Sequence, residues 1–279
     1  MLEVEDFLVS HEKFSIKECD NCRFRYTDNP PSEQEAGAYY EDEDYVEHSD
    51  KQEGLIFKLY HIGRKWMLNR KLRLIQKHTK EGRILDVGSA SGYFMNHMKS
   101  AGYGVDGIEI SPKARELCKS KFDINAYEPK SLINKELDSK YDIISLWHVF
   151  EHVYTYNEYF EAFEHFLKDD GRLLIAMPNH KCLDSEYYGK YWCAYDVPRH
   201  LWHFEPKTFE TFVRKRGFRL EAIKRMPLDP FYNAMVSASY KKSFTFLPWT
   251  LYIGLLSYVQ SLFNKKRSSS IIYVLKKNI

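Results

Sequence analysis

The sequence has no strong excess of either charge. It contains 41 Lys and Arg residues against 39 Asp and Glu residues in 279 positions, for a net charge of +2. This balance creates no general field that would attract a polyanion, so the composition does not support a nucleic-acid partner. The charge is unevenly distributed, because residues 1–50 hold 15 acidic and 4 basic residues, a net −11 that leaves +13 on residues 51–279. We therefore expect an acidic appendage on a basic body.

Cysteine is also scarce. The five cysteines lie far apart and are odd in number, and no charged, apolar and small-residue leader opens the sequence. Neither feature is typical of a secreted, disulfide-bonded domain, so we expect a cytoplasmic protein. The 44% hydrophobic content and the length exclude a wholly disordered chain.

The order of sequence patterns predicts an α/β fold. Residues 1–50 combine a Cys19–Cys22 pair, a Pro30–Pro31 break and an acidic run, which predicts an irregular N-terminal segment. Residues 51–279 form the main domain, with a helical lead-in within 51–80. The expected strands are 83–87, 105–110, 141–147, 172–177, 219–225 and 270–276, and the expected helices are 92–101, 112–121, 156–167 and 207–215. Such alternation predicts a doubly wound, mostly parallel sheet with helices on both faces.

The strongest local pattern is a small-residue turn between a buried strand and a helix. Asp86 lies within the strand 83–87, and Gly88, Ala90 and Gly92 follow that strand. Small residues let the backbone approach a ligand closely, and free amides at a helix N-terminus favour an anionic group. Glu109 ends the next strand, where its carboxylate can accept hydrogen bonds from both hydroxyls of a ribose. The pattern predicts a nucleoside-containing cofactor, although it does not match the GxGxxG signature of dinucleotide-binding proteins.

The sequence from Asp86 to Gly92 resembles the first motif of the class I S-adenosylmethionine-dependent methyltransferases, with Ala90 in place of the middle glycine. Segments 141–152 and 170–175 are similar to the family's fourth and fifth strands. The resemblance implies a seven-stranded sheet whose last strand, 270–276, is antiparallel. It also implies that S-adenosylmethionine is the cofactor and S-adenosylhomocysteine the product. The residues expected to bind the cofactor are Asp86, Gly88, Ser89, Ala90, Gly92, Tyr93, Phe94, Glu109, Ile110 and Trp147.

The resemblance implies transfer of a methyl group to a small-molecule, sugar, glycan-lipid or quinone-like acceptor, with O-methylation preferred. A catalytically silent cofactor-binding subunit or scaffold is the alternative. The aromatic stretch 179–203 follows the fifth strand, where acceptor pockets form, or it is a packing flap. His148 is the first choice for a base near the methyl group, and His200 is the second candidate.

His148, Glu151 and His152 have the i, i+3, i+4 spacing of one face of a helical turn. HxxEH alone is a zinc-protease signature, but here it follows a sheet strand. It is similar to the ExxEH of small-RNA 2′-O-methyltransferases and some quinone O-methyltransferases, where it helps to hold a divalent metal. Completed by His200 or His203, such a site would suit zinc, manganese or iron better than magnesium. The preferred interpretation has no metal, with Glu151 and His152 orienting each other beneath the pocket.

Two appendages complete the sequence. The Cys19–Cys22 pair is similar to the zinc-ribbon-like segment of some bacterial methyltransferases, but the second cysteine pair is missing, so we expect a degenerate version. An apolar insertion at about 228–268 precedes the last strand, and its core 244–263 has no charged residue and is flanked by lysines. We expect an amphipathic helix that packs on the body or in a homodimer, or that contacts the cytoplasmic face of a membrane.

Overall fold

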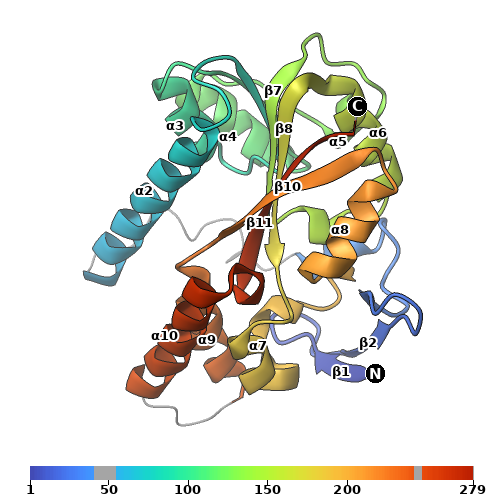
Figure 1. Ribbon diagram of the computed structural model, residues 1–279, viewed down its shortest axis with the longest axis vertical. Helices are drawn as coiled ribbons and strands as arrows, with labels where there is room; N and C mark the ends of the chain where they lie inside the picture. The colour runs from blue at the N-terminus through green and yellow to red at the C-terminus, as the bar shows by residue number, and fades with distance from the viewer. Residues whose placement is uncertain (41–54, 242–246, 279) are drawn as a thin grey trace.

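A computed structural model describes residues 1–40, 55–241 and 247–278. Its centre is a seven-stranded sheet with the order β10-β11-β8-β7-β4-β5-β6 (Figure 1). The strands are β4 (Arg83–Val87), β5 (Gly104–Ile108), β6 (Ala126–Tyr127), β7 (Tyr141–Trp147), β8 (Leu167–Pro178), β10 (Phe218–Arg225) and β11 (Ser270–Lys277). β11 runs antiparallel to both of its neighbours, β10 and β8, whereas the pairings from β8 to β6 are parallel. The expected seven-stranded sheet with an antiparallel last strand is confirmed.

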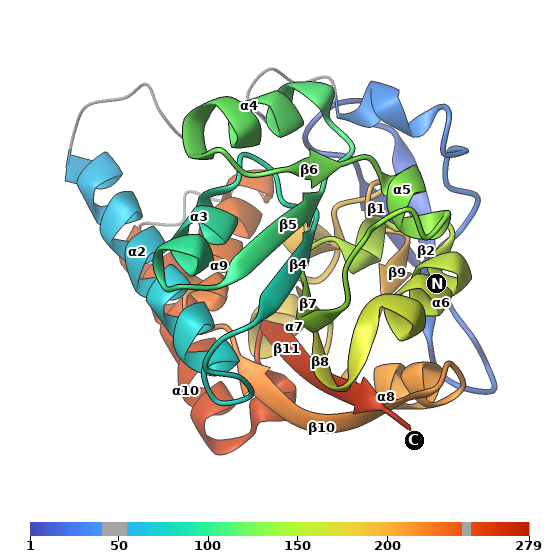
Figure 2. The same ribbon diagram turned by 90° about the horizontal axis from the view of Figure 1, so that it is seen from above.

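Helices cover both faces of this sheet, as expected (Figure 2). One face packs on α5 (Pro129–Ile133), α6 (Tyr156–Phe166) and α8 (Pro206–Arg214). The other packs on α2 (Leu55–Ile75) and α3 (Tyr93–Ser100), with α4 (Pro112–Phe122) near the β6 edge. The central strand β4 is buried from Ile84 to Val87, because helices exclude water from both of its faces.

Three short strands form within the N-terminal segment, which we expected to be irregular. β1 (Leu2–Glu5), β2 (Lys13–Glu18) and β3 (Arg25–Thr27) make an antiparallel sheet whose fourth strand is β9 (Trp202–His203). The alternation Phe14, Ile16 within β2 supplies an apolar side to this sheet, and Ile16 is buried. The N-terminal sheet therefore combines β1, β2 and β3, from the start of the chain, with β9, which follows much later in the sequence. The acidic run 41–50 lies outside the described residues.

The apolar insertion forms two helices, α9 (Asp229–Tyr240) and α10 (Leu247–Phe263), between β10 and β11. Together with α7 (Leu183–Tyr188) they lie beyond the carboxyl end of β8, at the lower left and lower centre of Figure 1. A separate apolar cluster joins these helices to β1 and β2. In the described part of the chain, no helix has the length and apolar character needed to cross a membrane.

Candidate functional site

The turn after β4 requires backbone conformations that favour glycine. Gly88, Ala90 and Gly92 all have positive φ, at 75°, 45° and 81°. A Cβ on Gly88 would lie 2.2 Å from a methyl carbon of Val149, so this position has no room for a side chain. Ala90 adopts the left-handed conformation despite its methyl group, at a cost of roughly 1 kcal/mol. The turn thus keeps the shape that the glycine pattern predicted, although its middle glycine is replaced.

Asp86 lies buried directly below this turn, where it accepts a hydrogen bond of 2.7 Å from the Ser145 hydroxyl. Burial raises the pKa of Asp86 to about 7, and the Ser145 hydrogen bond and the ammonium of Lys71 act in the opposite direction. Burial also lowers the pKa of Lys71 to about 8. Lys71 comes from α2 and places its Nζ 4.1 Å from the centre of the Trp147 ring. The charges of Lys71 and Asp86 therefore influence each other's pKa near Trp147.

Glu109 directly follows β5 and reaches the turn. Its carboxylate accepts hydrogen bonds from the backbone N–H groups of Ala90, at 2.8 Å, and Ser111, at 2.9 Å. Ile110, next in the chain, is 75% exposed and so presents an apolar surface beside this carboxylate. A crowded glycine turn, a carboxylate at the next strand end and an open apolar surface fit the chemistry of an adenosine-containing group.

The other expected cofactor residues lie around the same turn. Phe94 is buried and packs edge-on against Trp147, with 5.4 Å between ring centroids. The Trp147 indole Nε1 is buried without a hydrogen-bond partner, and so is the Ser89 hydroxyl. Tyr93 points toward α4 instead, where its hydroxyl accepts a 2.7 Å hydrogen bond from Lys121 and its ring contacts Phe122. Trp147 and Ser89 therefore lie buried beside the turn, whereas Tyr93 supports the helix behind it.

His148 follows β7 directly and lies between two carboxylates. Its Nδ1 is 3.4 Å from Glu151, and its Nε2 is 3.3 Å from Asp229, the first residue of α9. Burial acts to lower the pKa of His148, but the hydrogen bonds to Asp229 and Glu151 outweigh it and raise the pKa to about 10. The imidazole therefore carries a positive charge at neutral pH. The backbone at His148 is also left-handed, with φ of 58°.

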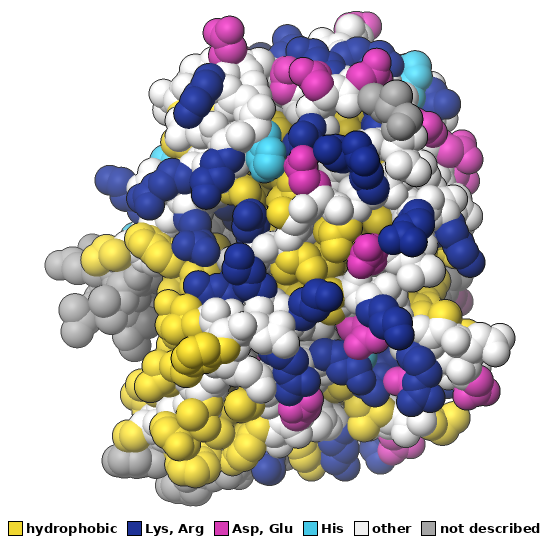
Figure 3. Space-filling model, viewed as in Figure 1, with side chains coloured by type: hydrophobic (Ala, Val, Ile, Leu, Met, Phe, Trp, Pro, Cys, Tyr) yellow, Lys and Arg dark blue, Asp and Glu magenta, His cyan; other side chains and the backbone are white. Residues whose placement is uncertain are grey.

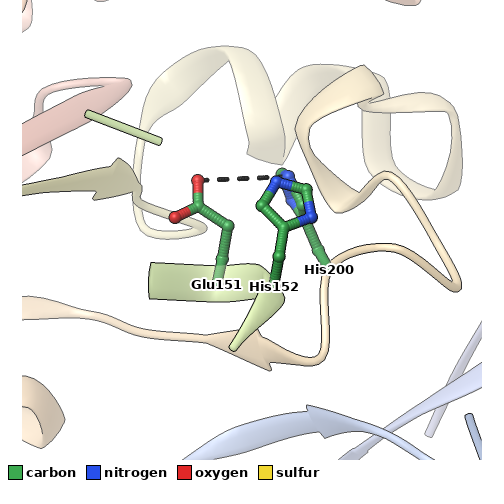
Figure 4. Close-up of side chains that lie close together, drawn as sticks. All are labelled: Glu151, His152 and His200. Carbon is green, nitrogen blue, oxygen red and sulfur yellow. Dashed lines mark ion pairs between the residues drawn. The ribbon is translucent and has the colours of Figure 1, made fainter. Parts of the chain in front are cut away.

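Glu151, His152 and His200 form a second group beside His148, which we call the Glu151 cluster (Figure 4). Glu151 and His152 lie in a single 3-10 turn, Phe150–His152, and His200 reaches them from the segment before β9. One atom from each side chain lies within 4.8 Å of the others. His148 and Glu151 therefore do meet, but His200 joins the cluster from a distant part of the sequence.

His203 does not belong to the Glu151 cluster. It is buried in β9, where its Nε2 lies 3.0 Å from the Thr27 hydroxyl and its ring packs on Tyr195. Its position on the N-terminal sheet gives it a role in packing that sheet against the body. Of the two histidines that the sequence offered to complete the site, the structure brings His200 to Glu151.

Comparisons with known proteins agree with this geometry. A family model described as a methyltransferase domain matches residues 59–223. The ubiquinone biosynthesis O-methyltransferase of Pelagibacter ubique (strain HTCC1062) is 29% identical over 178 residues, which cover 59% of this chain and 72% of that protein.

Solved structures share the fold. A SAM-dependent methyltransferase from Archaeoglobus fulgidus matches with a TM-score of 0.51 and 19% identity, covering 80% of this chain and 100% of that one. The magnesium protoporphyrin IX methyltransferase of Synechocystis PCC 6803, solved with bound SAH, matches with a TM-score of 0.51 and 14% identity, covering 82% and 90%.

The chain belongs to the methyltransferase domain family. It is an S-adenosylmethionine-dependent methyltransferase, and the family predicted from the glycine turn and the later motifs is confirmed.

Two polar residues beside the site of this methyltransferase were missed from the sequence. Lys71 lies in the helical lead-in and Asp229 in the apolar insertion, and neither belongs to a recognisable motif. Both are brought in by helices outside the alternating core of the domain. The one available signal was that each is a charged residue within or beside an apolar helical pattern.

The aromatic stretch 179–203 of the methyltransferase is mainly a packing element. Tyr188, Trp192 and Tyr195 are buried in the cluster that joins α9 and α10 to the N-terminal sheet. A cavity of about 420 Å³ lies between that sheet and α7, lined by residues that include Arg25 and His180. Its lining does not include the glycine turn or the Glu151 cluster, so we do not assign the acceptor to it.

The Cys19–Cys22 pair lies in the turn that joins β2 and β3. Within the described residues, the group of three or more potential ligands that could hold a metal is the Glu151 cluster, which contains no cysteine. The interpretation of the pair as a degenerate zinc-ribbon-like segment stays a prediction.

Proposed function

We propose that this methyltransferase methylates a hydroxyl group of a small-molecule acceptor, such as a sugar, a glycan-lipid or a quinone-like ring. The observation that carries the proposal is the group of His148 and the Glu151 cluster at the carboxyl end of β7, directly after Trp147. A neutral hydroxyl is a weak nucleophile, so its methylation gains from groups that bind and remove its proton. A site for an already nucleophilic amine would have less use for this set of side chains.

Each part of the site has a proposed role. S-adenosylmethionine supplies a methyl carbon that is electrophilic because it is bonded to a positively charged sulfur. Asp86 and the turn Gly88–Gly92, with Ser89, Ala90, Phe94 and Trp147, would hold its methionine part, and Glu109 and Ile110 its adenosine part. His200 donates its Nδ1 hydrogen to the carbonyl oxygen of Ala194 at 2.9 Å, which leaves the Nε2 lone pair facing the cluster. That lone pair can accept a proton, and the positive charge of the His148 imidazolium, whose two N–H groups face Glu151 and Asp229, would stabilise negative charge that develops on the acceptor oxygen.

The sequence relative supports an oxygen acceptor. The protein from Pelagibacter ubique is named as an O-methyltransferase of ubiquinone biosynthesis, and its match covers 59% of this chain. A catalytically silent cofactor-binding subunit would not need the charged groups that are buried at the strand ends. We therefore keep the enzyme as the working function.

We also propose that the protein works at the cytoplasmic face of a membrane. Figure 3 shows hydrophobic side chains gathered over α10, with basic side chains above them over α2. Large apolar side chains of α10 are exposed, namely Leu247, Trp249, Leu251, Tyr252, Leu255, Val259, Leu262 and Phe263. Exposed apolar area beside basic residues is typical of helices that lie in an anionic membrane surface. This position would bring the site close to lipid-linked acceptors.

The test of the hydroxyl proposal is methyl transfer from labelled S-adenosylmethionine. Quinol, glycolipid and sugar fractions would be offered to the purified protein, and the labelled atom identified by mass spectrometry and NMR. We expect an O-methyl product, and we expect His200→Ala to lower turnover by about 100-fold or more. S-adenosylhomocysteine binding, measured by calorimetry, should change little in that variant.

The matched control is His165→Gln, which alters an exposed histidine of α6 outside the site. Its turnover should equal that of the wild-type protein. A labelled nitrogen or carbon in the product, or full turnover in His200→Ala, would contradict the proposal.

A further inference from the structure

We propose that the cavity between the N-terminal sheet and α7 is a second binding site, for a small organic anion that has an apolar carbon skeleton and a carboxylate or phosphate group. The cavity has a volume of about 420 Å³, enough for a small molecule. It lies apart from the glycine turn and the Glu151 cluster, so this ligand is distinct from the cofactor and from the methylated hydroxyl.

A buried histidine without a partner lines this cavity. His180 follows the end of β8 by two positions and is 4% exposed, and neither of its ring nitrogens has a hydrogen-bond partner in the described part of the chain. Burial, together with the charges of Arg25 and Lys181, lowers the pKa of His180 to about 3, so the imidazole is neutral at pH 7. A neutral imidazole offers one N–H donor and one acceptor, and burying both unpaired is costly. A molecule in the cavity that pairs with either nitrogen would reduce this cost.

The charges around the cavity favour an anion. Two carboxylates line it, and each is paired with a guanidinium: Glu18 with Arg25 at 2.8 Å, and Glu186 with Arg267 at 2.6 Å. Lys181 also lines the cavity and forms no ion pair with any carboxylate that the structure describes. Arg25 gives its Nε–H to Glu18, and a guanidinium has four further N–H donors. Lys181 and Arg25 can therefore bind a carboxylate or a phosphate.

Apolar side chains in the lining favour an organic anion over an inorganic one. Leu2 of β1 and Ile16 of β2 are direct neighbours in the N-terminal sheet, and both line the cavity. Tyr195, which is buried, contributes an aromatic ring. Pockets that combine apolar walls with a few polar groups are typical of sites for small molecules. A bare phosphate ion would leave these apolar walls in contact with water.

A ligand in this cavity would join two parts of the fold. Arg25 lies in β3, in register with His203 of β9, whereas His180 and Lys181 lie between β8 and α7. An anion bound by Arg25 and Lys181 would therefore connect the N-terminal sheet to the segment after β8. Because such a ligand binds the folded protein only, it should raise the unfolding temperature.

The experiment uses the full chain with any affinity tag at the C-terminus, because Met1 borders the cavity. The probes are 2-naphthoate and 2-naphthyl phosphate, and the controls are the neutral 2-naphthalenemethanol and inorganic phosphate. Calorimetry would measure affinity, and thermal unfolding would measure stabilisation. We expect saturable binding of one naphthyl anion per chain and a higher unfolding temperature. Both control compounds should bind at least about tenfold more weakly. A preference for either anion supports the site and identifies its anionic group.

Two variants test the residues that would hold the anion. Lys181→Gln removes the unpaired cation, and His180→Leu removes the imidazole but keeps an apolar side chain in its place. Each should weaken binding of the naphthyl anions by about tenfold or more. Lys17→Gln is the matched control, because Lys17 lies between Ile16 and Glu18 in β2 and so points to the opposite face of the sheet. It should bind as the wild type does.

Three results would overturn the inference: no saturable binding of either naphthyl anion, equal or tighter binding of the neutral alcohol, or equal binding by the wild type and both cavity variants. Displacement of the probe by S-adenosylhomocysteine would also overturn it, because the probe would then occupy the cofactor site. Methyl transfer would be measured separately with S-adenosylmethionine and no probe. Failure of the cavity site would therefore leave the proposed function standing, and loss of turnover would not affect probe binding.

Discussion

Glu109 connects two parts of the cofactor site at the scale of single residues. Its carboxylate accepts hydrogen bonds from backbone N–H groups of the glycine turn and of the loop before α4. Hydrogen bonds to a charged group each contribute about 1.5–3 kcal/mol, so this side chain both shapes the turn and is placed to bind a ribose. Its loss should therefore weaken cofactor binding and also loosen the turn.

We expect Glu109→Ala to weaken S-adenosylhomocysteine binding by at least about 100-fold, because two charge-assisted hydrogen bonds to the ribose would be lost. Calorimetry would measure the affinity, and circular dichroism would verify folding. Glu116→Ala, at an exposed position of α4, serves as the control and should bind normally. A folded Glu109→Ala protein with unchanged affinity would remove Glu109 from the cofactor site.

The residues of the cofactor turn could be predicted because they are local. Asp86, Gly88 and Gly92 lie within seven positions, and Glu109 follows at the next strand end. His200 could be named as a candidate, but its choice over His203 depends on a two-residue strand pairing that no local pattern reveals. Asp229 could not be predicted as a site residue for the same reason. It approaches His148 only because α9 folds back over the strand ends.

At the scale of elements, α10 turns a row of large apolar side chains away from the body. The stripe of Leu251, Leu255, Val259 and Phe263 is exposed. The buried side of α10 consists of Ile253 and small or polar residues, and a Cβ on Gly254 would lie 2.9 Å from the Phe231 ring. Close approach of α9 thus uses the small residues, which leaves the large apolar ones outside. The insertion was predicted correctly as helical, and the exposed stripe leaves contact with a second copy or with a membrane as the remaining expectations.

The exposed stripe leads to a prediction about lipid. We expect the protein to sediment with phosphatidylcholine vesicles that contain phosphatidylglycerol, and to do so less at high salt. Leu251→Asp/Leu255→Asp should reduce this binding by more than about tenfold, because each buried leucine contributes about 1.5–3 kcal/mol. Leu117→Asp, at an exposed leucine of α4, is the control. If the wild type forms a dimer that the double variant separates, and shows no vesicle binding, the face is a subunit interface instead.

At the scale of the whole molecule, the N-terminal sheet is joined to the catalytic region by buried polar contacts. Arg199 forms ion pairs with Asp6, at 2.8 Å, and with Asp196, at 2.6 Å. The side chains of Asp6 and Arg199 are almost fully buried. The Thr27 hydroxyl donates to the carbonyl oxygen of His200 at 2.6 Å, and the Tyr40 hydroxyl lies 3.0 Å from His152 Nδ1. Residues 1–40 therefore contact His152 and the backbone of His200, and so help to hold the Glu151 cluster in place.

We expect Asp6→Ala to destabilise the protein by roughly 3–5 kcal/mol, because it leaves the buried Arg199 guanidinium short of a partner. Glu3→Ala removes an exposed pair with Lys13 on the same sheet and should cost less than about 1 kcal/mol. Urea denaturation followed by fluorescence would compare the two. Equal midpoints for both variants would mean that the sheet adds little to the stability of the body.

The central sheet was predictable at this scale, whereas the N-terminal sheet was not. Buried strands and amphipathic helices alternate over about two hundred residues, and every part of this pattern predicts the same parallel sheet. Small errors at element ends therefore do not change the predicted topology. The N-terminal strands are three to six residues long, and β3 gains its second neighbour from β9, about 175 positions later along the chain. Sequence patterns cannot detect pairing over that distance in strands so short.

The pairing of β3 with β9 also constrains how this protein could be recombined with others. His203 is in register with Arg25, and three positions before it lies His200, whose carbonyl oxygen accepts the Thr27 hydrogen bond. A chimera that exchanged residues 1–40 alone would place a foreign strand beside the segment that carries His200. Exchange of 1–40 together with 193–205 would keep both sides of this contact from one parent. Residues 1–40 and 193–205 therefore need to be exchanged together, although they lie far apart in the sequence.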